Sequence, residues 1–340
     1  MQVTENKRYN IHKSARLSCA PMMDWTDRHC RYMHRLLSRR TLLYTEMVTS
    51  PALVRGDARH LLRFDPSEQP VALQLGGSDP VELAKAAQMG ADAGYPEVNL
   101  NCGCPSDRVQ SGAFGAVLMK QPALVAECCA AMIAAQPAEV TVKCRIGVDD
   151  QDPEEVLPEF LARIVGAGVT RVTIHARKAW LQGLSPKENR DVPLLDYDLV
   201  HRMKGLFPNL HISINGGVST LEHAKELLDA GLDGVMIGRA AYHNPTDILQ
   251  AADAVVWGED MGPEPVDVVL QMRDYIEAHM ADTTRGGGKL MPVVKPMLGL
   301  FAGRPGARQW RRYLSENAHL GGAGWSTIED ALAAMERTAA

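Results

Sequence analysis

The feature that most constrains the fold is the alternation of short apolar, β-branched segments with longer stretches rich in Ala and Leu. Such alternation predicts parallel strands joined by crossover helices. Eight candidate strands follow one another along the chain, at 17–20, 42–46, 71–75, 98–101, 140–144, 172–175, 211–214 and 234–237. Eight strands ending in polar or glycine-rich turns match a closed barrel better than an open five- or six-stranded sheet. We therefore predict an α/β fold, the (β/α)8 TIM barrel.

The strand pattern stops after Ile248, which divides the chain into two parts. Segments 80–93 and 221–230, between candidate strands, repeat apolar residues at helical spacing. Prolines at 263 and 265 then introduce a helical pattern over 266–280 with no further strand. We predict a barrel over residues 10–257 and a C-terminal small helical domain over 258–340.

Composition excludes several classes of protein. The 340 residues are 46% hydrophobic and 23% charged, as in soluble globular proteins. The net charge of −5 indicates no overall affinity for polyanions such as DNA. Seven cysteines are an odd count, and the first residues lack a secretory pattern, so we expect no disulfides and a cytoplasmic location. The most apolar stretch, 124–135, contains Glu127 and is too short to cross a membrane.

The turns after the last two candidate strands carry glycines and a cation. They contain Asn215-Gly216-Gly217 and Gly238-Arg239. In TIM barrels these two loops form the usual phosphate site, where glycine amides can approach an anion closely. A lone glycine pair is more often a tight turn, but two such turns at paired positions favour a bound phosphate group.

Three polar side chains lie in or at the ends of candidate strands. Lys143 lies in VTVKCR and His175 ends VTIH, so alternation can point both at the barrel mouth. An unpaired lysine inside a barrel would cost several kcal/mol, which favours a ligand role for Lys143. His175 alone is equally consistent with a hydrogen-bonded core histidine. Gln74 adds an amide that could recognise the edge of a heterocycle.

Segment 99–106, NLNCGCPS, runs off the fourth candidate strand into a Gly-Pro turn that projects a thiol into the mouth. Cys102 and Cys104 lack a second pair at zinc spacing, so we expect no metal site. A buried inert thiol is the general alternative for any cysteine. Because Cys104 lies between Gly103 and Pro105 in a loop at the catalytic face, we favour a catalytic role.

Taken together, these segments resemble a known family. APMMDWTD, YTEM, NCGCPS, SINGG and MIGRA are similar to segments of the tRNA-dihydrouridine synthases, which are FMN-dependent barrels, and the resemblance covers nearly the whole chain. HARKAWLQGLSPKENR and PGARQWRRYLSENAH resemble the A subfamily in particular. The resemblance implies reduction of uridines 20 and 20a in the D-loop of tRNA, with NADPH as the reductant.

The resemblance also implies roles for single residues. Cys104 would be the catalytic acid, and Asn101 and Arg190 would hold the target base, with Lys187 as an RNA contact. FMN would be contacted by Pro21, Met22, Met23, Gln74, Lys143, His175, Asn215, Gly216, Gly217, Gly238 and Arg239. Family members commonly carry another residue where Cys102 stands. This departure leaves open an interaction between Cys102 and Cys104 or redox sensitivity, although a disulfide between them would be strained.

The chemical properties of these residues, taken without the resemblance, are also consistent with reduction of a uridine ring. Reducing a pyrimidine C5–C6 double bond requires a hydride at one carbon and a proton at the other. Reduced FMN would supply the hydride to C6, and a cysteine thiol, mostly protonated at neutral pH, would protonate C5. Lys143 and His175 would offset the negative charge of the flavin and of the developing enolate.

The C-terminal part carries a local positive charge. From residue 283 to residue 315 there are seven basic residues and no acidic one: Arg285, Lys289, Lys295, Arg304, Arg308, Arg311 and Arg312. Such a segment on an acidic body can bind a phosphate backbone, and Trp310 would offer stacking to a base. A solvated basic helix face is the alternative. We expect tRNA contacts at Arg304, Arg308 and Arg311.

Three alternatives and two open points remain at this stage. The alternatives are an FMN barrel oxidoreductase acting on small molecules such as dihydroorotate, a tRNA-binding folding factor, and a Schiff-base aldolase using Lys143. The basic segment argues against the first, and Cys104 with Lys143 against the second. NADPH rests on the resemblance alone, because no G-x-G-x-x-G segment follows a strand. We expect a monomer.

Overall fold

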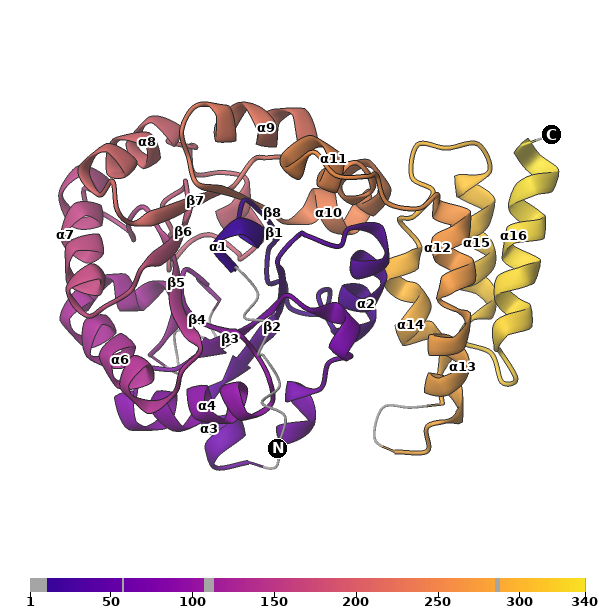
Figure 1. Ribbon diagram of the computed structural model, residues 1–340, viewed down its shortest axis with the longest axis horizontal. Helices are drawn as coiled ribbons and strands as arrows, with labels where there is room; N and C mark the ends of the chain where they lie inside the picture. The colour runs from indigo at the N-terminus through magenta and orange to yellow at the C-terminus, as the bar shows by residue number, and fades with distance from the viewer. Residues whose placement is uncertain (1–10, 57, 107–112, 285–287, 340) are drawn as a thin grey trace, which may run out of the picture.

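The computed structural model describes residues 11–56, 58–106, 113–284 and 288–339. Within these residues, eight parallel strands form one sheet in the order β1-β8-β7-β6-β5-β4-β3-β2. A bridge between Ser18 and Leu42 joins β1 to the start of β2, which closes the ring seen in Figure 1. The strands are β1 Leu17–Cys19, β2 Leu43–Thr49, β3 Val71–Gly76, β4 Glu97–Cys102, β5 Glu139–Arg145, β6 Arg171–His175, β7 His211–Asn215 and β8 Gly234–Ile237. The predicted TIM barrel is confirmed.

Helices surround the strands, and several begin at an Asp that the sequence places before Pro. Asp79 and Asp152 accept hydrogen bonds from Glu82 N and Glu154 N, which stabilises the first turns. The helices are α1 Ile11–Ser14, α2 Arg28–Leu37, α3 Ser50–Val54, α4 Pro80–Asp92, α6 Pro122–Ala135, α7 Pro153–Gly166, α8 Tyr197–Leu206, α9 Leu221–Asp229, α10 Arg239–His243 and α11 Ala252–Trp257. Short 3-10 helices occur at η1 Arg59–Leu62, η2 Pro66–Glu68, η3 Gly115–Lys120 and η4 Glu188–Arg190, and η5 Thr246–Gln250 is a π-helix.

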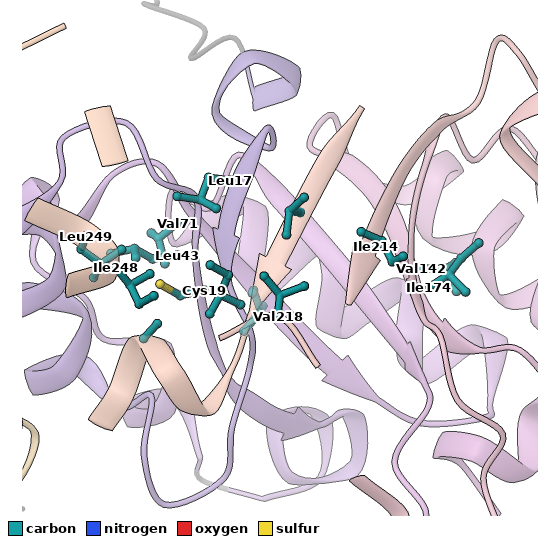
Figure 2. Packing of buried hydrophobic residues seen from close by; sticks show 14 of the residues in the cluster. Leu17, Cys19, Leu43, Val71, Val142, Ile174, Ile214, Val218, Ile248 and Leu249 are labelled. Atoms are coloured by element: carbon teal, nitrogen blue, oxygen red, sulfur yellow. The ribbon is translucent and has the colours of Figure 1, made fainter. Parts of the chain in front are cut away.

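The outward faces of the strands pack on these helices and form the main hydrophobic core. Leu43, Val71, Val142 and Ile174 are among its buried members, and Figure 2 shows them with Ile248 and Leu249, which come from η5. Alternation along each strand explains why these apolar residues recur at every second position.

The inward faces are divided between an apolar and a polar half. A small apolar cluster that includes Tyr44, Ala72 and Met236 comes from the β1, β2, β3 and β8 side. The remaining wall is polar and buried, and its side chains are Gln74, Glu97, Asn99, Asn101, Thr141, Arg171, Thr173, His175, Ser213 and Asn215. TIM barrels usually fill this space with branched apolar residues, so the polar wall requires a hydrogen-bonding or functional explanation.

Five helices follow the barrel and lie together on one side of it (Figure 1). They are α12 Pro265–Gln271, α13 Arg273–Ala281, α14 Leu290–Met297, α15 Ala307–Asn317 and α16 Trp325–Ala339. Gly258, in the left-handed conformation, ends α11 before them. Lys295 Nζ donates to Asp24 O in the loop after β1, at 2.7 Å, so these helices contact the end of the barrel where the strands have their carboxyl ends. No helix among the described residues is long and apolar enough to cross a membrane.

A buried ion pair lies at the amino-terminal end of the barrel. Arg171 contacts Glu97, and both side chains are almost completely inaccessible to solvent. Tyr44 OH donates to Glu97 Oε1 at 2.8 Å, and Arg171 Nη2 also reaches Glu139 Oε2 at 3.2 Å. Removing one partner of such a pair leaves an uncompensated charge in a dry interior.

We predict that Arg171→Met lowers the free energy of unfolding by about 3–5 kcal/mol, measured by urea denaturation. The control is Arg163→Met, which removes an exposed pair with Glu159 on α7 and should cost less than about 0.5 kcal/mol. Equal losses in the two variants would contradict a structural role for the buried pair.

Candidate active site

The Cys104 loop is fixed by the side chain of Asn101. Asn101 Oδ1 accepts hydrogen bonds from Gly103 N and Cys104 N, both at 3.0 Å. Cys104 O accepts from Ala116 N at 2.9 Å, which ties the loop to η3. The thiol is half-buried, and Sγ donates to Ser106 Oγ at 3.5 Å. The turn expected from the sequence therefore holds Cys104 directly beyond the carboxyl end of β4.

Cys102 has a different environment from Cys104. It is fully buried and pairs in register with Cys144 of β5. Burial raises the pKa of the Cys102 thiol well above its ordinary value, with Cys129, Cys144 and Cys128 nearby. All seven cysteines are free. Because Cys102 alternates with the inward-facing Asn101, it packs on the outer face of β4.

Lys143 lies inside the barrel, and its hydrogen-bond partner among the described residues is an amide and not a carboxylate. Its Nζ donates to Asn215 Oδ1 at 3.0 Å, and Asn215 Nδ2 donates to Met236 O at 2.8 Å. Burial and the charge of Arg145 lower the pKa of Lys143 to about 8. A neutral amide oxygen offsets only part of the free-energy cost of burying the Lys143 ammonium group. A bound anion beside Lys143 would therefore lower that cost further.

Arg145 adds a second buried cation two residues after Lys143. Its guanidinium donates to Gly103 O at 3.1 Å and to Asn189 O at 2.8 Å. Burial, with Arg190 and Arg177 nearby, lowers the pKa of Arg145 to about 10, and Cys104 acts in the opposite direction. Arg145 therefore links the Cys104 loop to the loop that follows β6.

His175 is neutral in this structure. Burial, together with the charges of Arg145, Lys143, Arg177 and Arg190, places the pKa of His175 well below its ordinary value. The expectation that His175 offsets the negative charge of a bound flavin concerns the protein with its ligand and stays a prediction. A neutral imidazole can still donate one N–H to a ligand.

Two further arginines have buried atoms without a partner. Nε of Arg177 and Nε of Arg190 are both inaccessible to solvent and lack a hydrogen bond. Arg239 is different, because it forms a bidentate pair with Asp191 at 2.6 and 3.2 Å. Among the residues that the structure describes around the mouth, the cations therefore exceed their acidic partners, which is the electrostatic pattern of an anion-binding site.

The Gly216-Gly217 turn after β7 packs closely against His175 and Leu195. Gly216 and Gly217 have φ values of 110° and 73°, which favour glycine. A side chain on Gly216 would lie 2.8 Å from His175 Cδ2, and one on Gly217 would lie 2.5 Å from Leu195 Cδ1. Both the backbone conformation and the close packing therefore exclude any larger residue, as the sequence predicted for a tight backbone cradle.

The other predicted cofactor and substrate residues lie around the same end. A side chain on Gly238 would lie 3.7 Å from Met22 Sδ, which places the loop after β1 beside the loop after β8. Met22 N donates to Thr26 Oγ1 at 2.9 Å, and the next residue, Met23, is 54% exposed. Pro21 is partly buried at the start of this loop, whereas Lys187 is exposed immediately before η4.

The basic C-terminal residues have mixed environments. Arg308 and Arg311 are exposed on α15, and Arg304 pairs with Asp247 at 3.0 Å. The expectation that Trp310 stacks on a base is wrong, because Trp310 is fully buried and its Nε1 donates to Met297 O at 3.0 Å. Arg285 lies outside the described residues.

Sequence reasoning missed Arg145 and Asn99. Both lie two positions from a residue that was identified, and alternation places them on the same inward face as Lys143 and Asn101. The periodicity was therefore sufficient to find them. Their partners, Asn189 O and Gln74 Nε2, come from other strands and loops and are not visible in the sequence.

Comparisons with known proteins agree with the geometry. The model of the family described as dihydrouridine synthase (Dus) matches residues 18–337. The chain belongs to the dihydrouridine synthase family. It is 54% identical to the tRNA-dihydrouridine(20/20a) synthase of Escherichia coli K12 over 96% of this chain and 93% of that protein. The enzyme of the same name from Vibrio cholerae is 54% identical over 94% of this chain and 96% of that protein.

A solved structure supports the fold of this family member. Morphinone reductase aligns with a TM-score of 0.50 and 13% identity, covering 74% of this chain and 88% of its own. At this identity the likeness concerns the barrel architecture alone.

We predict that Arg145→Gln raises the pKa of Lys143 above about 8, because it removes the nearest charge that disfavours the ammonium. The pKa is measured by NMR titration of the ¹⁵N-labelled lysine. Arg239→Gln is the control, since Arg239 is not among the groups that act on Lys143 and its removal should leave that pKa unchanged. A lower or unchanged value in Arg145→Gln would contradict the electrostatic description of the site.

Proposed function

We propose that this protein reduces uridine to 5,6-dihydrouridine in the D-loop of tRNA, at positions 20 and 20a, with FMN as cofactor and NADPH as reductant. The observation that carries the proposal is a half-buried thiol held at a barrel mouth rich in cations, in a chain 54% identical to tRNA-dihydrouridine(20/20a) synthases. A thiol proton donor beside uncompensated positive charge suits the addition of hydride and proton to a polarised double bond.

The residues present fit FMN. The incompletely compensated Lys143, with the unpartnered Nε of Arg177 nearby, calls for an anionic ligand. The glycine turns after β7 and β8 offer backbone without side chains, as a phosphate requires. FMN would be held by Gln74, Lys143, His175, Asn215 and the turns at Gly216, Gly217, Gly238 and Arg239, with Pro21, Met22 and Met23 from the loop after β1. Arg239 would exchange part of its contact with Asp191 for the phosphate.

Side chains of the protein would donate the proton, stabilise negative charge and hold the target base. When bound and reduced, FMN supplies a hydride. Cys104 Sγ donates the proton to the pyrimidine ring, and the Asn101 side chain fixes the loop that carries this thiol. Lys143 stabilises negative charge next to the cofactor, whereas neutral His175 contributes a hydrogen bond. Asn101 and Arg190 hold the target base.

The tRNA contacts extend beyond the mouth. Lys187 and Arg190 lie on the loop after β6, and the helices of residues 258–340 add Arg304, Arg308 and Arg311. Pulling a stacked uridine into a pocket costs a few kcal/mol, which contacts remote from the base can offset. We place the protein in the cytoplasm, acting as a monomer.

We predict that Cys104→Ala retains bound flavin and NADPH oxidation but loses uridine reduction by roughly 10²–10⁴-fold, because the proton donor is absent. Dihydrouridine is quantified in unmodified tRNA by nucleoside mass spectrometry. Cys102→Ala is the control, because Cys102 packs on the outer face of β4 and should leave the rate within a few-fold of the parent. Full activity in Cys104→Ala would remove the assignment of Cys104 as the acid.

We predict that Arg308→Gln with Arg311→Gln weakens tRNA binding and makes the slope of log Kd against log salt shallower by about 0.7–0.9 for each lost phosphate contact. Adding Arg304→Gln should have a smaller effect, because Arg304 already pairs with Asp247. Arg163→Gln with Arg202→Gln on the outer barrel helices is the charge-matched control. An unchanged slope in the α15 variant would exclude these arginines from the RNA contact.

A further inference from the structure

The inward face of β4 carries a polar stripe along the length of the barrel. Glu97, Asn99 and Asn101 occupy alternate positions, and none is more than 9% exposed. The intervening Val98 and Leu100 are buried on the outer face. This stripe connects the Arg171–Glu97 pair at one end of the barrel to the Cys104 loop at the other.

One continuous chain of hydrogen bonds follows the stripe. Thr141 Oγ1 donates to Glu97 Oε1 at 2.6 Å and accepts from Asn99 Nδ2 at 2.8 Å. Asn99 Oδ1 accepts from Gln74 Nε2 at 2.8 Å. Gln74 Oε1 then accepts from Asn101 Nδ2, again at 2.8 Å. Asn101 Oδ1 ends the chain by accepting the two backbone N–H groups of the Cys104 loop.

Both ends of this chain impose the same direction. The Glu97 carboxylate pairs with Arg171 and can only accept, so the single hydroxyl hydrogen of Thr141 must point to Glu97. Thr141 can therefore only accept from Asn99, which fixes the amide of Asn99 and then that of Gln74. At the other end, backbone N–H groups can only donate, which fixes Asn101 Oδ1 toward the loop. The carboxylate at one end and the backbone N–H groups at the other thus require the same orientation of the side-chain amides of Asn99, Gln74 and Asn101.

We propose that Thr141 and Asn99 are positioning residues that orient the Gln74 and Asn101 amides and thereby hold the Cys104 loop. Both oxygen lone pairs of Asn101 are occupied by the loop, and one of its two N–H hydrogens is bonded to Gln74. Asn101 therefore presents a single donor, which suits a carbonyl oxygen on a ligand. The catalytic consequence rests on the proposed function, whereas the ordering of the loop does not.

The test is hydrogen–deuterium exchange of the peptide that contains Gly103 and Cys104, in the protein as purified. Thr141→Val keeps the shape of the side chain and removes both hydrogen bonds, and Thr141→Ser keeps the hydroxyl. We expect exchange at these two amides to become about tenfold faster in Thr141→Val, corresponding to one lost hydrogen bond, and to be restored in Thr141→Ser. Thr173→Val, at the position on β6 that pairs with Lys143, is the matched control.

A general loss of stability would accelerate exchange everywhere, so the α9 peptide 221–229, which contains none of these groups, is followed in the same samples and should not change. Exchange at Gly103 and Cys104 that is equal in Thr141→Val, Thr173→Val and the parent overturns the proposal, as does equal acceleration in both peptides. If the loop is loosened in Thr141→Val but the parent reduces no uridine, the positioning chain stands and the proposed function fails.

A second measurement needs no substitution. In the unaltered protein, the side-chain amide hydrogens of Asn99 and Gln74 should exchange with solvent far more slowly than those of the exposed Gln182, observed by ¹⁵N NMR. Exchange of Asn99 as fast as that of Gln182 would show that the chain of hydrogen bonds is absent. This result decides the proposal even if Thr141→Val does not fold.

Discussion

The constraint on which the structure depends is that a closed barrel excludes water from an inner wall that is half polar. Every polar group on that wall needs a partner within the protein or on a ligand. At the amino-terminal end, Glu97 and Arg171 pair with one another, although Arg171 Nε and both ring nitrogens of His211 lack a hydrogen-bond partner in the part of the chain that the structure describes. At the mouth, Lys143 and Arg145 donate only to neutral oxygens among the described residues, and this difference in charge pairing distinguishes the mouth from the Arg171–Glu97 end.

The fold could be predicted from the sequence because its decisive features are local and periodic. Each strand places apolar residues outward at every second position, and each of the eight predicted segments lies within a few residues of an observed strand. The same periodicity located Lys143 and His175 at the mouth, whereas Asn101 came from the family resemblance. Family resemblance then supplied roles that alternation could not, such as that of Cys104 as an acid.

The rest could not be predicted because it depends on partners that are distant in the chain. The pKa of His175 is lowered first by burial and then by nearby charges, among them Arg145 on β5 and Arg190 farther along the loop after β6. Trp310 lies among arginines in sequence, yet the helical periodicity of α15 buries it, with Nε1 on Met297 O. The pairing of Arg239 with Asp191 joins residues 48 positions apart. The periodicity of the sequence identifies which side chains face inward, but not which of them contact one another.

The most direct test of the central claim, that this mouth delivers hydride and proton to a tRNA uridine, is nucleoside-resolved mass spectrometry of tRNA from cells with and without the protein. We predict that without it the uridines at positions 20 and 20a lack the two added hydrogen atoms, while other modified nucleosides are unchanged. Identical D-loops in the two samples would contradict the claim.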